Sequence, residues 1–136
     1  MEVHKYFSLY FLSIAIGASF GSVYHAVETK FHNFRSGLWK MIMICMVLSS
    51  VTLLLAVIFF SISSNDSSQK FLQILSFSIL FFSTIKIFNN DDITNAAIIY
   101  CPISFICAVV MSLSWYHNSN MDAKQILVGL IISLFG

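Results

Sequence analysis

The sequence predicts an all-α, polytopic transmembrane helical bundle with four full spans and a partial fifth, and three observations support this fold class. Of the 136 residues, 58% are hydrophobic and 10% are charged, whereas soluble domains carry about 25% charged residues. The seven Lys and Arg and the six Asp and Glu residues lie at the N-terminus or in short clusters. The uncharged stretches between these clusters approach the roughly 20 residues that a helix needs to cross about 30 Å of hydrocarbon.

We expect one transmembrane domain over residues 1–136. Its predicted helices are 6–27, 38–61, 70–88, 93–116 and 123–136. The first of these could be mistaken for a secretory signal, because Lys5 precedes an apolar run. Its uncharged run is longer than the usual signal core of about 7 to 15 residues, and no clear cleavage site precedes a soluble domain. We therefore interpret 6–27 as a retained helix.

The second helix, 38–61, has the strongest membrane signal. Thirteen Ile, Leu, Val or Phe residues lie between Ile42 and Ile62, and together they contribute about −4 to −8 kcal/mol to insertion. Trp39, between Arg35 and Lys40, is typical of an interfacial anchor.

The third helix, 70–88, is the shortest of the full spans, because Lys86 follows only fifteen uncharged residues. Its side chain can extend toward the headgroups, which lets Ile87 and Phe88 lengthen the span. The fourth helix, 93–116, follows the polar run 89–92, in which Asp92 is a good N-cap.

The fifth helix, 123–136, is about 21 Å long and too short for a full crossing. We therefore expect the chain to be a fragment of a larger bundle. Lys30, Arg35, Lys40 and Lys86 belong to one side in this topology, and the other side holds Lys5, Lys70 and Lys124. The small excess favours a cytoplasmic first loop and an external N-terminus.

Small residues in the first helix indicate a packing surface. Gly17 and Gly21 form a Gly-x-x-x-Gly pattern that lets a neighbouring backbone approach closely. At 100° per residue, His25 shares this stripe and should point into the bundle. Three interpretations remain open for His25: an interhelical hydrogen bond, a catalytic site with Ser22, Tyr24 or Glu28, and a metal site with Glu28 and His32.

No motif for a cofactor, a phosphate loop or a redox dithiol is present, and we expect no cofactor. The net charge of +1 argues against a nucleic-acid partner. The expected partners are the lipid bilayer and other transmembrane helices, from the same chain or from an oligomer. We therefore assign a structural or assembly role rather than catalysis.

The run 17–25, followed by Leu38-Trp39-Lys40, resembles an uncharacterised bacterial family of multi-pass membrane proteins. That family shares a small-residue helix ending in Gly-x-x-His and a Leu-Trp-Arg/Lys step, and its final Gly-rich helix is similar to 129–136. The resemblance implies a bacterial plasma membrane location, a helix before Met1 and others after Gly136, and no assigned activity.

A more distant likeness is to seven-helix membrane hydrolases of the alkaline ceramidase type, which place a Ser, an Asp and three His around zinc. Ser22 and His25 would be the matching start, but they are three residues apart, whereas those enzymes space them four apart. The matching Asp and closing His pair are absent from this sequence. A metal-dependent hydrolase with His25 in its site is the first alternative function, and a small transporter subunit is the second.

Overall fold

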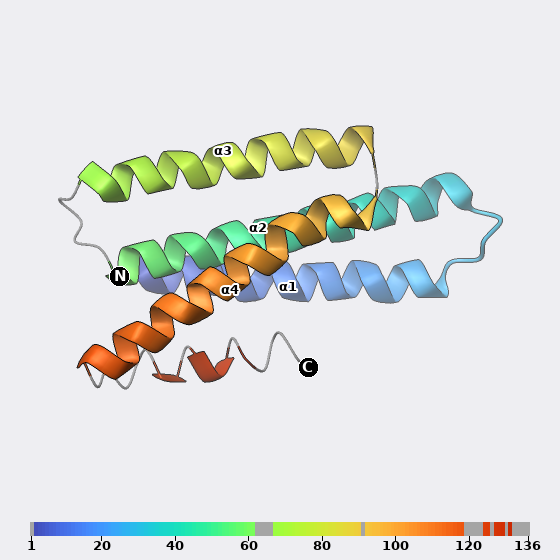
Figure 1. The fold of residues 1–136 in the computed structure, drawn as a ribbon. Coiled ribbons are helices and arrows are strands. Elements are labelled where there is room, and N and C mark those ends of the chain that lie inside the picture. The colour runs from blue at the N-terminus through green and yellow to red at the C-terminus, as the bar shows by residue number, and fades with distance from the viewer. Residues whose placement is uncertain are drawn as a thin grey trace.

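The computed structural model describes residues 2–61, 67–90, 92–118, 124–125, 127–129 and 131. Its elements are α1 (Glu2–Ala26), α2 (His32–Ser61), α3 (Ser67–Asn89) and α4 (Ile93–Asn118), shown in Figure 1. No strand occurs in these ranges, so the all-α prediction is confirmed. The described residues between 124 and 131 are helical and belong to the short fifth helix, and the remainder of 123–136 lies outside the described residues.

The four helices are each long and apolar enough to cross a membrane. Their candidate spans contain 24, 30, 23 and 21 residues in chain order. At a rise of 1.5 Å per residue these spans are about 31 to 45 Å long, compared with about 30 Å of hydrocarbon. The prediction of four full spans is therefore confirmed.

The start of α2 differs most from the predicted bounds, because α2 begins at His32 and not near Leu38. The sequence prediction places a loop here because Lys30 and Arg35 are charged. The Arg35 amide instead donates to the Phe31 carbonyl at 3.0 Å, which belongs to the first helical turn. The charged residues therefore mark the end of the apolar stretch and do not mark the end of the helix.

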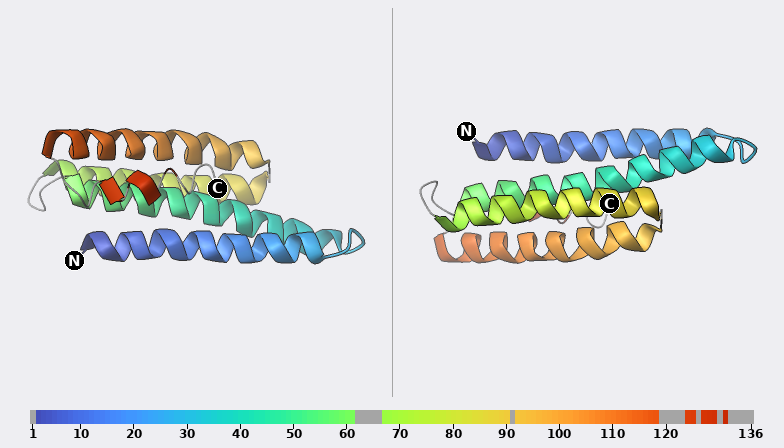
Figure 2. Two further views of the ribbon diagram at one scale, coloured as in Figure 1. Left: turned by 90° about the horizontal axis from the view of Figure 1, so that it is seen from below. Right: turned by 90° about the horizontal axis from the view of Figure 1, so that it is seen from above.

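α2 is the central helix of the bundle. It contacts each of the other three helices, whereas α1 contacts only α2 among the four. Figure 2 shows α1 and α4 on opposite sides of α2, with α3 alongside it. The connections α1–α2 and α3–α4 lie at the same end, and the α1–α2 hairpin extends beyond the α3–α4 connection in all three views.

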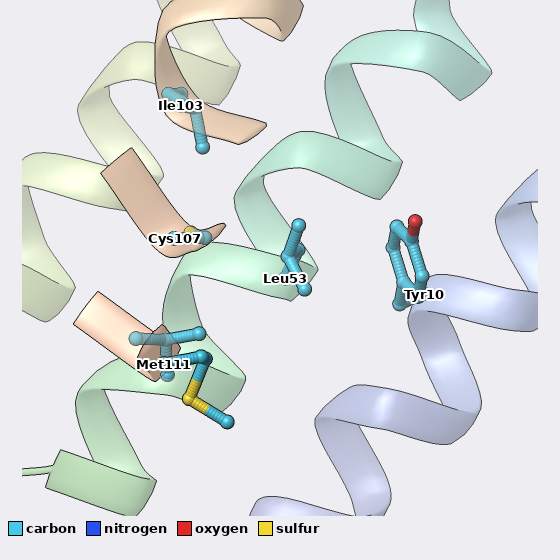
Figure 3. Close-up of a cluster of buried hydrophobic side chains, with 6 residues drawn as sticks. Tyr10, Leu53, Ile103, Cys107 and Met111 are labelled. Carbon is cyan, nitrogen blue, oxygen red and sulfur yellow. The ribbon is translucent and has the colours of Figure 1, made fainter. Parts of the chain in front are cut away.

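Two hydrophobic clusters meet on α2. The first joins α1, α2 and α4, and Figure 3 shows Leu53 between Tyr10 and Cys107. The second joins α2 to α3 and α4 through Val47, Ile87 and other buried residues. Because α2 contributes to both clusters, 67% of an 18-residue apolar stretch of α2 is buried, compared with 11% for the corresponding stretch in α1, 17% in α3 and 28% in α4.

The less exposed residues of α1 follow an alternating spacing of four and three. They include Tyr6, Tyr10, Ser13, Gly17, Phe20 and Tyr24. This spacing averages 3.5 residues per turn, as in a left-handed coiled coil. α1 and α2 lie close together at Gly17, where an added Cβ would lie 3.1 Å from the Cβ of Cys45.

Polar contacts hold the α3–α4 connection against α2. Lys40 Nζ donates to the Phe88 carbonyl at 3.2 Å, a favourable place for a cation because it is the C-terminal end of α3. Asp92 caps α4 as predicted, accepting from the Thr94 amide at 3.0 Å and from the Thr94 hydroxyl at 2.8 Å. These two hydrogen bonds, the backbone one first, lower the pKa of the Asp92 carboxyl.

Candidate functional site

His25 lies on an exposed face of α1, so the expectation that it points into the bundle is corrected. Its ring packs edge-on against Tyr24, with centroids 5.5 Å apart. The seam of α1 alternates four and three residues, which brings Tyr24 toward α2 and leaves His25 about 100° further around the helix. At this end of α1 the small-residue pattern predicts that His25 faces α2, whereas in the structure the preceding residue, Tyr24, faces α2.

The other candidate catalytic and metal residues do not gather around His25. The Ser22 hydroxyl donates to the carbonyl of Ala18 at 3.1 Å, within its own helix. Glu28 lies in the loop and pairs with Lys30. His32 is the first residue of α2, so His25 and His32 belong to different helices. Over the described positions, no three His, Cys, Asp or Glu side chains come together as a metal site.

The two glycines of the expected packing stripe differ in their surroundings. Gly17 lies against Cys45 of α2, as described above. At Gly21 an added Cβ would meet no heavy atom within 4 Å. The contact with Cys45 therefore supports a role for Gly17 in close helix packing. For Gly21 such a role stays a prediction.

A pocket of about 420 Å³ lies at the end of the α1–α2 hairpin. Its lining residues come from both helices and from the loop between them: Tyr24, Thr29, His32, Arg35, Ser36 and Trp39. The Arg35 guanidinium lies over the Tyr24 ring, 4.5 Å from its centroid, and the Trp39 ring centroid is 5.4 Å from that of Tyr24. Of this group the sequence placed Arg35 and Trp39 together at the membrane interface, and it indicated Tyr24 and His32 only as possible partners of His25. The spacing of three and four residues from Tyr10 to Tyr24 was the signal that could have placed Tyr24 against α2.

Hydroxyl side chains inside the helices bond to the backbone of their own helix. Ser13, Ser50 and Ser76 donate to carbonyls three or four residues earlier, at 2.7 to 2.8 Å. Ser104 differs, because its buried hydroxyl has no hydrogen-bond partner in the described part of the chain. None of these hydroxyls is placed against a base, so they form no nucleophilic site.

Three of the four buried residues of α3 are polar, and most of its large apolar residues are exposed. Gln69, Ser76 and Ser83 are buried against the bundle. On the outer surface, Phe81 and Phe82 are 63% and 69% exposed, and other large apolar residues of α3 share this exposure: Phe71, Ile74, Leu75, Phe77, Ile85 and Phe88. This distribution is the reverse of that on the surface helix of a water-soluble protein.

Comparison with models of known protein families matches residues 1–136 to a family of unknown function (DUF6962). No curated protein and no solved structure matches the chain. The arrangement of the helices therefore carries the functional argument.

Proposed function

The chain belongs to this family of unknown function, and from that premise we propose that it is a multi-pass integral membrane protein with a structural or assembly role. In this proposal the outer faces of α1, α3 and α4 contact lipid or other transmembrane helices. The apolar lengths of the four helices are compatible with that location.

The reversed polarity of α3 is the observation that carries the proposal. Leaving a Phe side chain in water forgoes about 1.5 to 3 kcal/mol of burial free energy. Four exposed residues of α3, Phe71, Phe77, Phe81 and Phe82, would together forgo about as much as the whole net stability of a typical domain. In hydrocarbon that cost disappears, and the buried polar residues become the favourable ones to place inside.

The positions of the acidic residues favour a structural role over transport or hydrolysis. The six Asp and Glu residues lie at 2, 28, 66, 91, 92 and 122, all outside the candidate spans. A proton-coupled transporter generally needs a carboxylate within the membrane. A metal-dependent hydrolase would need a shell of metal ligands, and among the described residues no three His, Cys, Asp or Glu side chains come together. Packing against other helices requires only accessible apolar and small residues.

α1 supplies such a surface for assembly. Its exposed face carries the small residues Ala18, Ser19 and Ser22 beside the large ones Phe11 and Leu12. Small side chains let a second helix approach closely in a bilayer. The partner in this proposal is another transmembrane helix, either from the same protein or from another subunit.

The cations support an orientation with the α1–α2 loop in the cytoplasm. Lys30, Arg35, Lys40 and Lys86 lie at the end of the bundle that holds the α1–α2 and α3–α4 connections. Lys5 and Lys70 lie toward the opposite end, and the predicted topology assigns Lys124 to that side as well, so the excess is four cations against three. The positive-inside rule then gives an external N-terminus, and the resemblance to bacterial multi-pass proteins points to the plasma membrane.

The proposal is tested by alkaline extraction of membranes that contain the full chain, combined with a charge placed on the outer face of α3. The wild-type protein should stay in the membrane pellet and require detergent for solubility. Phe82→Asp should reduce insertion, because an acidic side chain near the middle of a span costs about 3 kcal/mol. Phe82→Leu is the matched control and should insert normally.

A water-soluble protein would behave in the opposite way. Its Phe82→Asp variant would be at least as soluble as the wild type, because the side chain would enter water. Recovery of the wild-type chain as a monodisperse species without detergent would contradict the membrane proposal. Insertion of Phe82→Asp at the wild-type level would contradict contact between this face and lipid.

A further inference from the structure

The pocket at the α1–α2 end lies at the depth of phospholipid headgroups if the chain spans a membrane as proposed. α2 contains 30 residues and is about 45 Å long, so it extends beyond roughly 30 Å of hydrocarbon. The hairpin that holds the pocket projects past the α3–α4 connection (Figures 1 and 2). Phe31 and Phe34 are exposed on this hairpin beside the pocket, which suits contact with the membrane interface.

Arg35 is arranged to bind an anion. Its guanidinium lies over the Tyr24 ring, 4.5 Å from the ring centroid, and a guanidinium carries five N–H donors. This contact uses the positive charge of the group and no acceptor oxygen or nitrogen, so it leaves N–H donors available for an anion. Within the described ranges the guanidinium is paired with no carboxylate and donates no hydrogen bond. A planar fork of donors matches two oxygens of a phosphate.

The rest of the lining complements an anion of modest size. Thr29 and Ser36 contribute hydroxyl groups, and Trp39 contributes an indole ring. Glu28, the acidic residue next to Thr29 in sequence, pairs with Lys30 and does not line the pocket. The lining therefore contains Arg35 and no acidic side chain. The pocket has a volume of about 420 Å³, which falls within the usual range of small-molecule binding sites.

We propose that this pocket binds the phosphate group of an anionic phospholipid headgroup. The Arg35 guanidinium contacts the phosphate oxygens and is positioned by the Tyr24 ring beneath it. The hydroxyl of Thr29 donates a hydrogen bond to the phosphate. The acyl chains then run along the hydrocarbon-facing surface of the α1–α2 hairpin. This inference rests on the proposed membrane location and adds the class of lipid and the residues that recognise it.

Trp39 fluorescence provides a direct measurement, because bromine on a nearby lipid quenches an indole. The full chain carrying Trp115→Phe, which leaves Trp39 as its only tryptophan, is reconstituted in phosphatidylcholine vesicles. A minority of the lipid is replaced by brominated phosphatidylglycerol or, in parallel, by brominated phosphatidylcholine. We expect the anionic lipid to bind near Trp39 about fivefold more tightly than the zwitterionic lipid, the preference that one interfacial cation typically supplies.

Three variants separate the pocket from general surface charge. Arg35→Gln should abolish the preference. Thr29→Phe, which fills the pocket from the exposed loop and keeps every charge, should abolish it as well. Lys30→Gln is the matched control, because it removes a cation from the same hairpin outside the pocket lining, and it should keep most of the preference. Equal losses in Lys30→Gln and Arg35→Gln would overturn the proposal, as would an unchanged preference in Thr29→Phe.

Two further measurements identify the ligand and separate this proposal from the membrane proposal. Inorganic phosphate at millimolar concentration should not compete with the brominated anionic lipid, and full competition would show a site for free phosphate instead. The wild type and all three variants should float with vesicles of phosphatidylcholine alone. Failure of the wild type to float would contradict the membrane location, whereas flotation of every variant with no lipid preference would contradict the pocket assignment alone.

Discussion

α2 and α3 are neighbouring helices with different buried faces, because most buried residues of α2 are apolar and three of the four in α3 are polar. α2 places Met43, Val47 and Leu53 in the interior, and 67% of its 18-residue apolar stretch is buried. α3 buries Gln69, Ser76 and Ser83 and directs its phenylalanines outward, with 17% of the corresponding stretch buried. Water as the surrounding solvent would explain α2 but not α3. The pair therefore indicates that contact with neighbouring helices, and not polarity alone, decides what lies inside this bundle.

The largest expected effect comes from opening a cavity in α2. Leu53 is 1% exposed and packs between α1 and α4 (Figure 3). Leu53→Ala should lower the free energy of unfolding by about 2 to 5 kcal/mol, because the packed residues around it cannot fully close the space. The matched change on the outer face of α3, Phe81→Ala, should cost about 0.5 kcal/mol or less. Unfolding in mixed detergent micelles measures both, and equal losses would remove the distinction between the two helices.

The close approach of α1 to α2 gives the second effect. Gly17→Leu should destabilise the bundle by about 1 to 3 kcal/mol, because its Cβ would already lie 3.1 Å from Cys45 Cβ. Gly21→Leu has open space and should change stability by about 0.5 kcal/mol or less. The same unfolding assay compares the two variants, and a larger loss at Gly21 would place the seam of α1 on the stripe that includes His25.

Two buried serines should respond in opposite directions. The Ser104 hydroxyl of α4 has no partner among the described atoms, so Ser104→Ala should raise stability by about 1 kcal/mol. The Ser76 hydroxyl of α3 donates to the Leu72 carbonyl at 2.7 Å, and Ser76→Ala should lower stability by up to about 1 kcal/mol. A loss of stability in Ser104→Ala would reveal a hydrogen bond made by that hydroxyl in the bilayer.

The smallest effect concerns Asp92 at the start of α4 and depends on pH. Its folded pKa is lowered by the hydrogen bonds from Thr94, so its contribution to stability is present above the unfolded pKa of about 4 and is lost as pH falls through the folded pKa. Asp92→Asn keeps an N-cap without a titrating group. Between about pH 5 and pH 3, the wild type should therefore lose stability relative to Asp92→Asn. Parallel curves for the two proteins would show that the cap does not titrate with folding.

The sequence was most informative about the number of spans and least informative about their rotation. Thirteen large apolar residues between Ile42 and Ile62 marked α2 without reference to any neighbour, and the capping residue Asp92 marked the start of α4. The inward face of α1 was assigned to the stripe of Gly17, Gly21 and His25. The structure keeps Gly17 against Cys45 but turns Tyr24, and not His25, toward Trp39.

The candidate site shows the same division. Arg35 and Trp39 could be assigned to the membrane interface from their types and spacing, because a cation and an indole at the end of an apolar span are typical of headgroup depth. Their association with Tyr24 depends on how α1 packs against α2, along a seam that repeats every 3.5 residues and not every 3.6. The sequence also did not predict that residues 32–37 are helical, because the charged residues there favour a loop. This first part of α2 places Arg35 over the Tyr24 ring.

By itself, the sequence determined the fold class, the four apolar spans and the ends at which cations gather, because the thickness and polarity of a bilayer act on each segment separately. Only the tertiary structure decided which side of each helix faces inward, which glycine meets a neighbouring backbone and which side chains line the α1–α2 pocket. Those features depend on the rotation of one helix against another. A shift of one residue turns a helix face by about 100° while leaving its length and hydropathy unchanged.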